Sequence, residues 1–214
     1  MKKSINNDIN TTQIPPAGNV FNKYESGNPI VRRLMRGFIS SLDELLSLTA
    51  ATDIHEIGCG EGYLSTGILS SRGGKVRGCD LSPEMVESAK TRALSAGIPP
   101  SFKVSSVYDL SEDVDSAGLV VCCEVLEHLD RPDKAMEVLS RLANPHLILS
   151  VPREPVWKIL NLMRARYISS LGNTPGHIQH WSKTSFLKFV DKYVDIIAIR
   201  SPLPWTMVLC HKRL

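Results

Sequence analysis

The stretch HEIGCGEGY, residues 55–63, decides the fold, because a short apolar segment runs there into three glycines at alternate positions. Gly58, Gly60 and Gly62 let the backbone turn tightly into a following helix, and they let a ligand approach the chain closely. Asp80 ends the next predicted strand about twenty residues later, where a carboxylate can accept hydrogen bonds from ribose hydroxyls. These residues together predict a binding site for a nucleoside-containing cofactor.

The spacing of the glycines separates several kinds of nucleotide site. The pattern is GxGxG, preceded by the acid Glu56, and it lacks the GxGxxG form associated with a dinucleotide pyrophosphate. It also lacks the Lys-Ser/Thr pair of a phosphate-binding P-loop. A dinucleotide-dependent oxidoreductase on a similar fold is the structural competitor, and the glycine spacing argues against it. A glycine-rich turn of structural value only is a minor alternative, because Glu56 and Asp80 stand in register with it.

Strands and helices alternate outward from this turn. Strands are predicted over 53–57, 75–80, 101–106, 117–125, 146–152, 194–201 and 205–212, and helices over 28–48, 82–97, 131–143 and 182–193, with a further helix directly after the glycines. The first helix is expected to bury Ile30, Leu34, Phe38, Leu42, Leu45 and Leu46, which recur at helical spacing. The alternation predicts an α/β fold with a mostly parallel sheet that is covered on both faces.

Length and composition set the limits of this prediction. The chain has 214 residues, 43% hydrophobic and 22% charged, which fits one domain over 23–214 after a flexible polar arm over 1–22. A lid-like insertion is expected at about 153–180, although core packing is the stronger interpretation of its apolar face. We expect no signal peptide and no membrane span, hence a cytoplasmic protein. The five cysteines form no CxxC pair and are expected to be reduced, and the sequence does not set the oligomeric state.

Five stretches resemble the class I S-adenosylmethionine-dependent methyltransferases, in that family's order. They are EIGCGEG, VRGCDLSPEMVESA, FKVSSVYDL, LVVCCEVLEHL and LILSVP, and the resemblance covers nearly the whole chain from about Tyr24. It implies a Rossmann-like three-layer sandwich with a seven-stranded sheet in the order 3-2-1-4-5-7-6. It also implies S-adenosylmethionine as the cofactor.

The resemblance assigns cofactor-binding roles residue by residue. Glu56 is expected to contact the amino acid moiety, Asp80 to hold the ribose, and Ser106 to stand where the family usually has an acid or polar residue on the adenine amino group. The other expected cofactor-binding residues are Gly58, Cys59 and Gly60 beneath the ligand, Leu81, Met85 and Val107 near the adenine, and Cys123.

A second cluster, CCEVLEHLD over residues 122–130, follows the apolar strand that contains LVVCC. On a helix, Glu124, Glu127 and His128 stand at i, i+3 and i+4, so all three could face one side, at the edge of the sheet where ligands bind. A hydroxyl that accepts a methyl group must lose its proton, so a base or a metal ion is useful there. The later stretch GHIQHW adds His177 and His180.

Two interpretations of this cluster stay open. Either the carboxylates bond backbone amides and His128 lines the pocket, or a divalent metal, Mg or Mn before Zn, binds Glu124, Glu127, His128 and His177. Small-RNA 2′-O-methyltransferases and ubiquinone-pathway O-methyltransferases show a similar pairing of an E-x-x-E-H turn with a later histidine four residues before Trp181. Without a metal, His128, His177 or His180 could act as the base.

The sequence therefore predicts an S-adenosylmethionine-dependent methyltransferase, with O-methylation of a small-molecule acceptor as the first hypothesis. Methylation of a nucleic acid partner, at the 2′-oxygen of an RNA end, is the second. A net charge of only +3 and the lack of interleaved aromatic and basic residues argue against it. A third hypothesis is a regulatory protein that binds the cofactor without catalysis.

Overall fold

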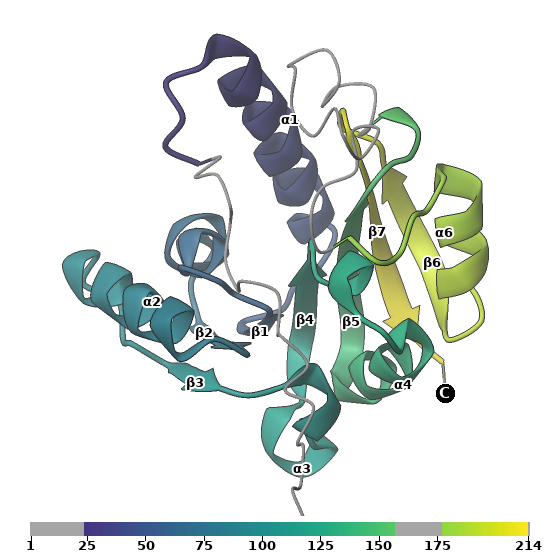
Figure 1. The fold of residues 1–214 in the computed structure, drawn as a ribbon. Coiled ribbons are helices and arrows are strands. Elements are labelled where there is room, and N and C mark those ends of the chain that lie inside the picture. The colour runs from purple at the N-terminus through teal and green to yellow at the C-terminus, as the bar shows by residue number, and fades with distance from the viewer. Residues whose placement is uncertain (1–23, 157–176, 214) are drawn as a thin grey trace, which may run out of the picture.

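The computed structural model describes residues 24–156 and 177–213, which form a central sheet between helices (Figure 1). The sheet has seven strands in the order β3-β2-β1-β4-β5-β7-β6, and β7 runs antiparallel to the other six. The predicted sheet and its strand order are confirmed. The arm expected over 1–22 and most of the expected lid, residues 157–176, lie outside the described residues.

The elements have the following bounds. The strands are β1 Asp53–Ile57, β2 Lys75–Asp80, β3 Phe102–Val104, β4 Ala117–Cys123, β5 Ala143–Pro152, β6 Val194–Arg200 and β7 Trp205–Lys212. The helices are α1 Pro29–Leu46, α2 Pro83–Ser95, α3 Glu112–Asp115, α4 Pro132–Leu142 and α6 Lys183–Val190. Single helical turns occur at Ser65–Leu69, Ser70–Arg72, Val107–Asp109 and Leu126–His128.

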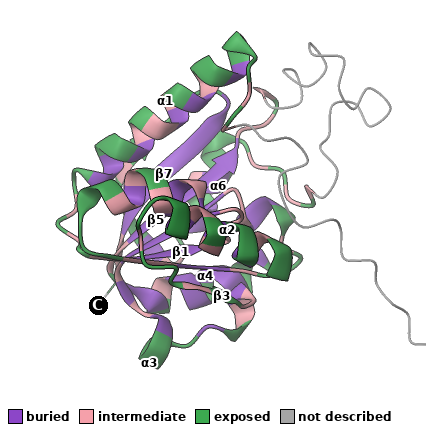
Figure 2. Ribbon diagram, turned by 90° about the vertical axis from the view of Figure 1, so that its left-hand side faces the viewer, coloured by how far each residue is buried: buried purple, intermediate pink, exposed green. Residues whose placement is uncertain are grey.

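The central strands of the sheet are buried (Figure 2), because an apolar cluster lies on each face. Met136 of α4 and Phe186 of α6 pack on one face, and Phe38 and Leu42 of α1 pack on the other. Strand β4 is buried along most of its length because it is covered on both faces, which explains its continuous apolar sequence. The three-layer sandwich is therefore the observed architecture.

Two helices differ in detail from the expectation. The buried face of α1 begins at Val31 and Met35 rather than Ile30, which is 60% exposed in the first turn beside its cap Asn28. The helix expected after the glycines is a wide turn that breaks at Gly67, whose φ of −100° and ψ of −105° are not helical. Glycine tolerates this conformation at little steric cost.

The direction of β7 brings a tryptophan to the functional edge of the sheet. Because β7 is antiparallel to β5, its first residue, Trp205, pairs with Pro152 at the carboxyl end of β5. The carboxyl ends of β1 and β4 lie at the same edge, because these strands are parallel to β5. Trp205 therefore stands where ligands of open parallel sheets bind.

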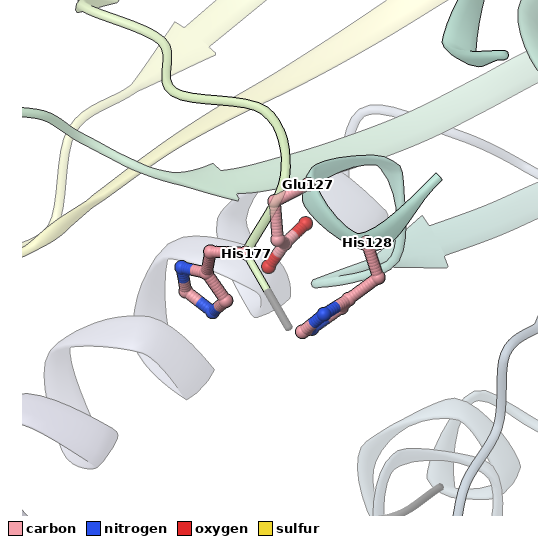
Figure 3. A group of neighbouring side chains, drawn as sticks. All are labelled: Glu127, His128 and His177. Atoms are coloured by element: carbon pink, nitrogen blue, oxygen red, sulfur yellow. The ribbon is translucent and has the colours of Figure 1, made fainter. Parts of the chain in front are cut away.

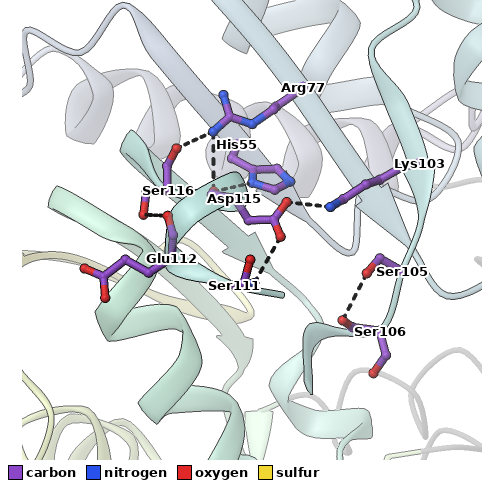
Figure 4. A network of polar contacts seen from close by, with 9 residues as sticks. All are labelled: His55, Arg77, Lys103, Ser105, Ser106, Ser111, Glu112, Asp115 and Ser116. Carbon is purple, nitrogen blue, oxygen red and sulfur yellow. Dashed lines mark hydrogen bonds and ion pairs between the residues drawn. The ribbon is translucent and has the colours of Figure 1, made fainter. Parts of the chain in front are cut away.

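A polar network fastens the start of β4 to β1, β2 and β3 (Figure 4). His55 donates from Nδ1 to the carbonyl oxygen of Asp115 at 2.8 Å, and Arg77 donates to the carbonyl oxygens of Asp115 and Ser116. Lys103 Nζ lies 2.5 Å from Asp115 Oδ1, and this aspartate is only 4% exposed. Buried polar groups need such partners, so we assign the network to stability.

None of the helices within residues 24–156 and 177–213 has both the length and the apolar character needed to cross a membrane.

Candidate active site at the carboxyl edge of the sheet

The glycine turn after β1 has a backbone conformation that disfavours residues with side chains. Gly58 and Gly60 have φ values of 74° and 52°, and the amides of Gly58 and Cys59 donate to the carbonyl oxygen of Cys79 at 2.8 and 2.9 Å. A Cβ atom on Gly58 would lie 2.3 Å from Val125, whereas a Cβ atom on Gly60 would meet nothing within 4 Å among the described residues. Gly58 is thus needed for packing, and Gly60 borders open space.

Asp80 is held against this turn by two backbone amides. Its Oδ2 accepts from Gly60 N at 2.8 Å, and its Oδ1 accepts from Ser82 N at 3.0 Å. Ser82 caps α2 through a bond from Met85 N to its hydroxyl at 3.3 Å, and Leu81 between them is 57% exposed. Asp80 ends β2 and Ser82 caps α2 two residues later. This arrangement holds the Asp80 carboxylate beside the glycine turn.

Glu56 is a buried acid on β1, only 3% exposed. Burial raises the pKa of this carboxyl to about 8, and the charge of Asp80 adds to the rise. The hydroxyl of Ser65, in the turn that follows the glycines, donates to Glu56 Oε2 and opposes the shift. Ser65 is not among the residues predicted from the sequence, although a hydroxyl one turn beyond a glycine loop is a detectable signal.

The other residues expected at the cofactor site lie around the same edge. Cys59, Val107 and Cys123 are buried, with exposures of 6%, 7% and 8%. Burial also raises the pKa of the Cys59 thiol, so this sulfur is not a nucleophile near neutral pH. Ser106 accepts from Tyr108 N at 3.3 Å and begins the turn beside Val107. Their contacts with a cofactor remain predictions.

The chain turns sharply at Glu124, directly after β4. This residue has a φ of 61°, a left-handed conformation that costs a non-glycine residue of order 1–3 kcal/mol. Its carboxylate accepts from Ser150 Oγ at 3.0 Å and from Trp205 Nε1 at 2.5 Å. The strand predicted over 117–125 ends at Cys123, and only Leu126–His128 form a helical turn after it. Glu124 therefore does not share a helix face with Glu127 and His128.

Three other predicted residues do converge (Figure 3). Glu127, His128 and His177 each offer one ligand atom, and these atoms all lie within 4.8 Å of one another. The His128 and His177 ring centroids are 4.9 Å apart at an interplanar angle of 79°. Glu127 is buried, His128 is exposed and His177 is half-buried. The group therefore extends from the protein interior to the surface.

Backbone bonds bring His177 to this position from a distant part of the sequence. The amides of Ile178 and Gln179 donate to the carbonyl oxygen of Glu127 at 2.8 and 3.0 Å. The same segment places His180 elsewhere, with its Nδ1 3.6 Å from Glu154 Oε1. Among the described residues, the convergent group thus contains neither Glu124 nor His180.

The fold and the glycine turn with its acid resemble those of the class I S-adenosylmethionine-dependent methyltransferases. Residues 55–150 match the family described as methyltransferase domain, so the resemblance drawn from the sequence is confirmed. A solved structure of magnesium protoporphyrin IX methyltransferase from Synechocystis PCC 6803 with bound SAH has this fold. It superposes with a TM-score of 0.66 and 22% identity, over 89% of this chain and 91% of that chain.

More particularly, the chain is similar to ubiquinone biosynthesis O-methyltransferases. It is 28% identical over 151 residues to that of Marinobacter nauticus, which is 68% of this chain and 62% of the relative. It is 34% identical over 126 residues to that of Xanthomonas axonopodis pv. citri, which is 57% of this chain and 52% of the relative. The match thus spans about half to three-fifths of these curated relatives.

Proposed function

We propose that the chain binds S-adenosylmethionine at the glycine turn. The space beside Gly60 admits the ligand, Asp80 offers carboxylate oxygens to the ribose, and Glu56 offers a carboxylate to the amino acid moiety. The amino acid end of the cofactor is lined by Gly58, Cys59 and Cys123. The adenine is faced by Leu81, Met85, Ser106 and Val107. The proposal places the bound cofactor across the carboxyl ends of β1, β2 and β4.

The reaction we propose is methyl transfer to a hydroxyl group of a small molecule, in the cytoplasm. Methyl transfer from a sulfonium mainly requires that the nucleophile be aligned with the S-methyl bond. A hydroxyl must in addition lose its proton, and the group of Glu127, His128 and His177 at the end of β4 carries this proposal. The similarity to O-methyltransferases supports it independently.

The same three residues suit a divalent cation, because two imidazole nitrogens and a carboxylate lie within 4.8 Å of one another. Such a cation, Mg or Mn in our proposal, lowers the pKa of a hydroxyl that it binds. Glu127 and the two histidines would hold it and leave positions open to the acceptor. Without a cation, His128 is the best placed base, because it is the exposed member of the group.

Methylation of an RNA end is the second candidate. The observation that favours it is the same convergence, because small-RNA 2′-O-methyltransferases resemble this chain in their E-x-x-E-H turn and later histidine. The modest net charge of +3 favours a small acceptor instead. A regulatory role without turnover is the third candidate.

The test supplies the full chain with methyl-labelled S-adenosylmethionine and, separately, a panel of hydroxylated aromatic compounds and short RNAs. We expect label in a small-molecule fraction and stoichiometric S-adenosylhomocysteine. Asp80→Asn should lose cofactor binding, whereas Asp113→Asn, a substitution of an exposed aspartate on α3, should not. Label in RNA alone would support the second candidate, and binding without turnover would support the third. No binding by the wild type would refute all three.

A further inference from the structure

The first described residue, Tyr24, is fastened over the glycine turn by a stack of three side chains. Its ring lies parallel to that of Tyr63, with centroids 4.6 Å apart and an interplanar angle of 10°. The guanidinium carbon of Arg92 lies 3.5 Å from the Tyr63 centroid, so Tyr24 and Arg92 occupy opposite faces of this ring. Arg92 also donates to the carbonyl oxygen of Glu61 at 3.2 Å and lies 3.4 Å from Glu25.

The stack holds the half-buried Tyr24 against the apolar cluster that includes Ile54 of β1 and Cys123 at the end of β4. Burial raises the pKa of this phenol well above its ordinary value, and the groups that add to the rise are Glu56 on β1, Cys123 at the end of β4, Glu124 after it, and Tyr63. Tyr24 therefore keeps its proton and stands at the edge where β1 and β4 open toward the candidate site.

The groups around the phenol indicate what kind of ligand fits beside it. The groups that act on Tyr24 from β1, from the end of β4 and from the glycine turn are two carboxyls, a thiol and a second phenol, and none of these four is a cation. A ligand that carries positive charge complements such a wall, because the carboxyls can ionise beside it, and an aromatic face attracts cations as well. S-adenosylmethionine has an ammonium group and a sulfonium group, and its carboxylate can accept from the Tyr24 hydroxyl.

We propose that Tyr24 is a cofactor-binding residue whose hydroxyl contacts the amino acid end of S-adenosylmethionine. This inference rests on the proposed function, and it adds a residue that lies outside the matched methyltransferase domain, residues 55–150. In this arrangement Tyr63 and Arg92 are positioning residues. They hold the ring over the crevice from the side of α2, without contacting the ligand.

The experiment compares the affinities of four full-length proteins for S-adenosylmethionine and for S-adenosylhomocysteine by titration calorimetry. They are the wild type, Tyr24→Phe, Tyr24→Ala and the matched control Tyr193→Phe, in which the lost hydroxyl bonds to Asp133 at 2.6 Å. Tyr193 directly precedes β6, whose first residue pairs with Lys212, and so lies at the opposite edge of the sheet. Its removal should leave both affinities unchanged.

Tyr24→Phe keeps the ring and removes the hydroxyl, so we expect Kd to rise about tenfold for both ligands, as for other hydrogen bonds to charged groups. Tyr24→Ala should raise Kd further. A structural role alone would lower the melting temperature of the ligand-free protein and leave Kd unchanged. Wild-type affinity in Tyr24→Phe overturns the proposal. If Tyr24→Ala does not fold, the Kd of Tyr24→Phe alone tests the contact of the hydroxyl with the ligand. A wild type that binds neither ligand refutes the proposed function instead.

Discussion

The buried carboxyl of Glu56 predicts that the affinity for S-adenosylmethionine rises with pH. Burial, together with the charge of Asp80, raises the pKa of Glu56 to about 8 in the ligand-free protein, against the opposing bonds from Ser65. At neutral pH the carboxyl is therefore mostly protonated. A protonated carboxyl cannot pair with the ammonium group of the ligand, so binding must first remove a proton.

The size of the change in Kd follows from the difference between the assay pH and the pKa of Glu56. Between about pH 6 and 7 the ionised fraction of a group with a pKa near 8 rises about tenfold. The Kd should therefore fall about tenfold across that interval, which equals about 1.4 kcal/mol, with close to one proton released per ligand. This interval lies below the range of about 7.7–8.0 in which an α-amino group titrates, so the ligand itself contributes little.

Titration calorimetry in two buffers of different ionisation enthalpy measures both quantities at once. The Kd gives the slope with pH, and the difference between the observed enthalpies gives the number of protons released. Glu56→Gln stays neutral, so it should bind weakly and show no slope. The reasoning is refuted if the wild-type Kd is constant over the interval with no proton released, or if Glu56→Gln shows the same slope.

Three other changes test the metal group, the polar network and the glycine turn. Chelation should reduce methyl transfer by a factor of ten or more, with recovery on addition of Mg²⁺ or Mn²⁺ in the wild type but not in Glu127→Gln; full activity in metal-free buffer contradicts the metal. Asp115→Asn and Lys103→Met should each lower the free energy of unfolding in urea by about 1–3 kcal/mol, because each leaves a polar partner unsatisfied. Although burial raises the pKa of Asp115, the bonds from Lys103 and the backbone lower it overall. The stability it adds is present above about pH 4 and is lost as the pH falls through its folded pKa, so a wild type no more acid-sensitive than Asp115→Asn contradicts this role. Gly58→Ala should cost more unfolding free energy than Gly60→Ala, because only the former meets a valine side chain at 2.3 Å. Gly60→Ala should instead weaken cofactor binding, and unchanged binding counts against the proposed ligand position.

Local patterns explain why the order of elements could be predicted. Ser82 and Pro83 mark the start of α2, and the apolar run of β4 marks a strand covered on both faces, because each signal arises within a few neighbouring residues. The same periodicity predicts the buried face of α1 correctly at Phe38, Leu42, Leu45 and Leu46. Ile30, in the capped first turn, is exposed and Leu34 is only half-buried, so the prediction is wrong at the start of the helix.

The candidate site depends on contacts that no local pattern encodes. One dihedral angle at Glu124 turns its carboxylate toward Trp205, which is 81 residues away in the sequence and reaches it only because β7 is antiparallel. The stack of Tyr24 on Tyr63 likewise joins two segments through packing alone. The approach of His177 to Glu127 was expected from a family resemblance, and backbone bonds of its neighbours produce it. The metal stays a prediction.

The buried cysteines of this chain can report on its own conformation through their reactivity. All five thiols are free and buried, and burial raises the pKa values of Cys59, Cys79, Cys122 and Cys210. Alkylation requires both access and a thiolate, so each residue should react only when its surroundings open. Cys59 and Cys123 lie at the proposed cofactor site, and Cys210 lies within β7. Ligand-dependent protection of the first two, with Cys210 as the internal reference, would therefore map cofactor binding without any added label or engineered residue.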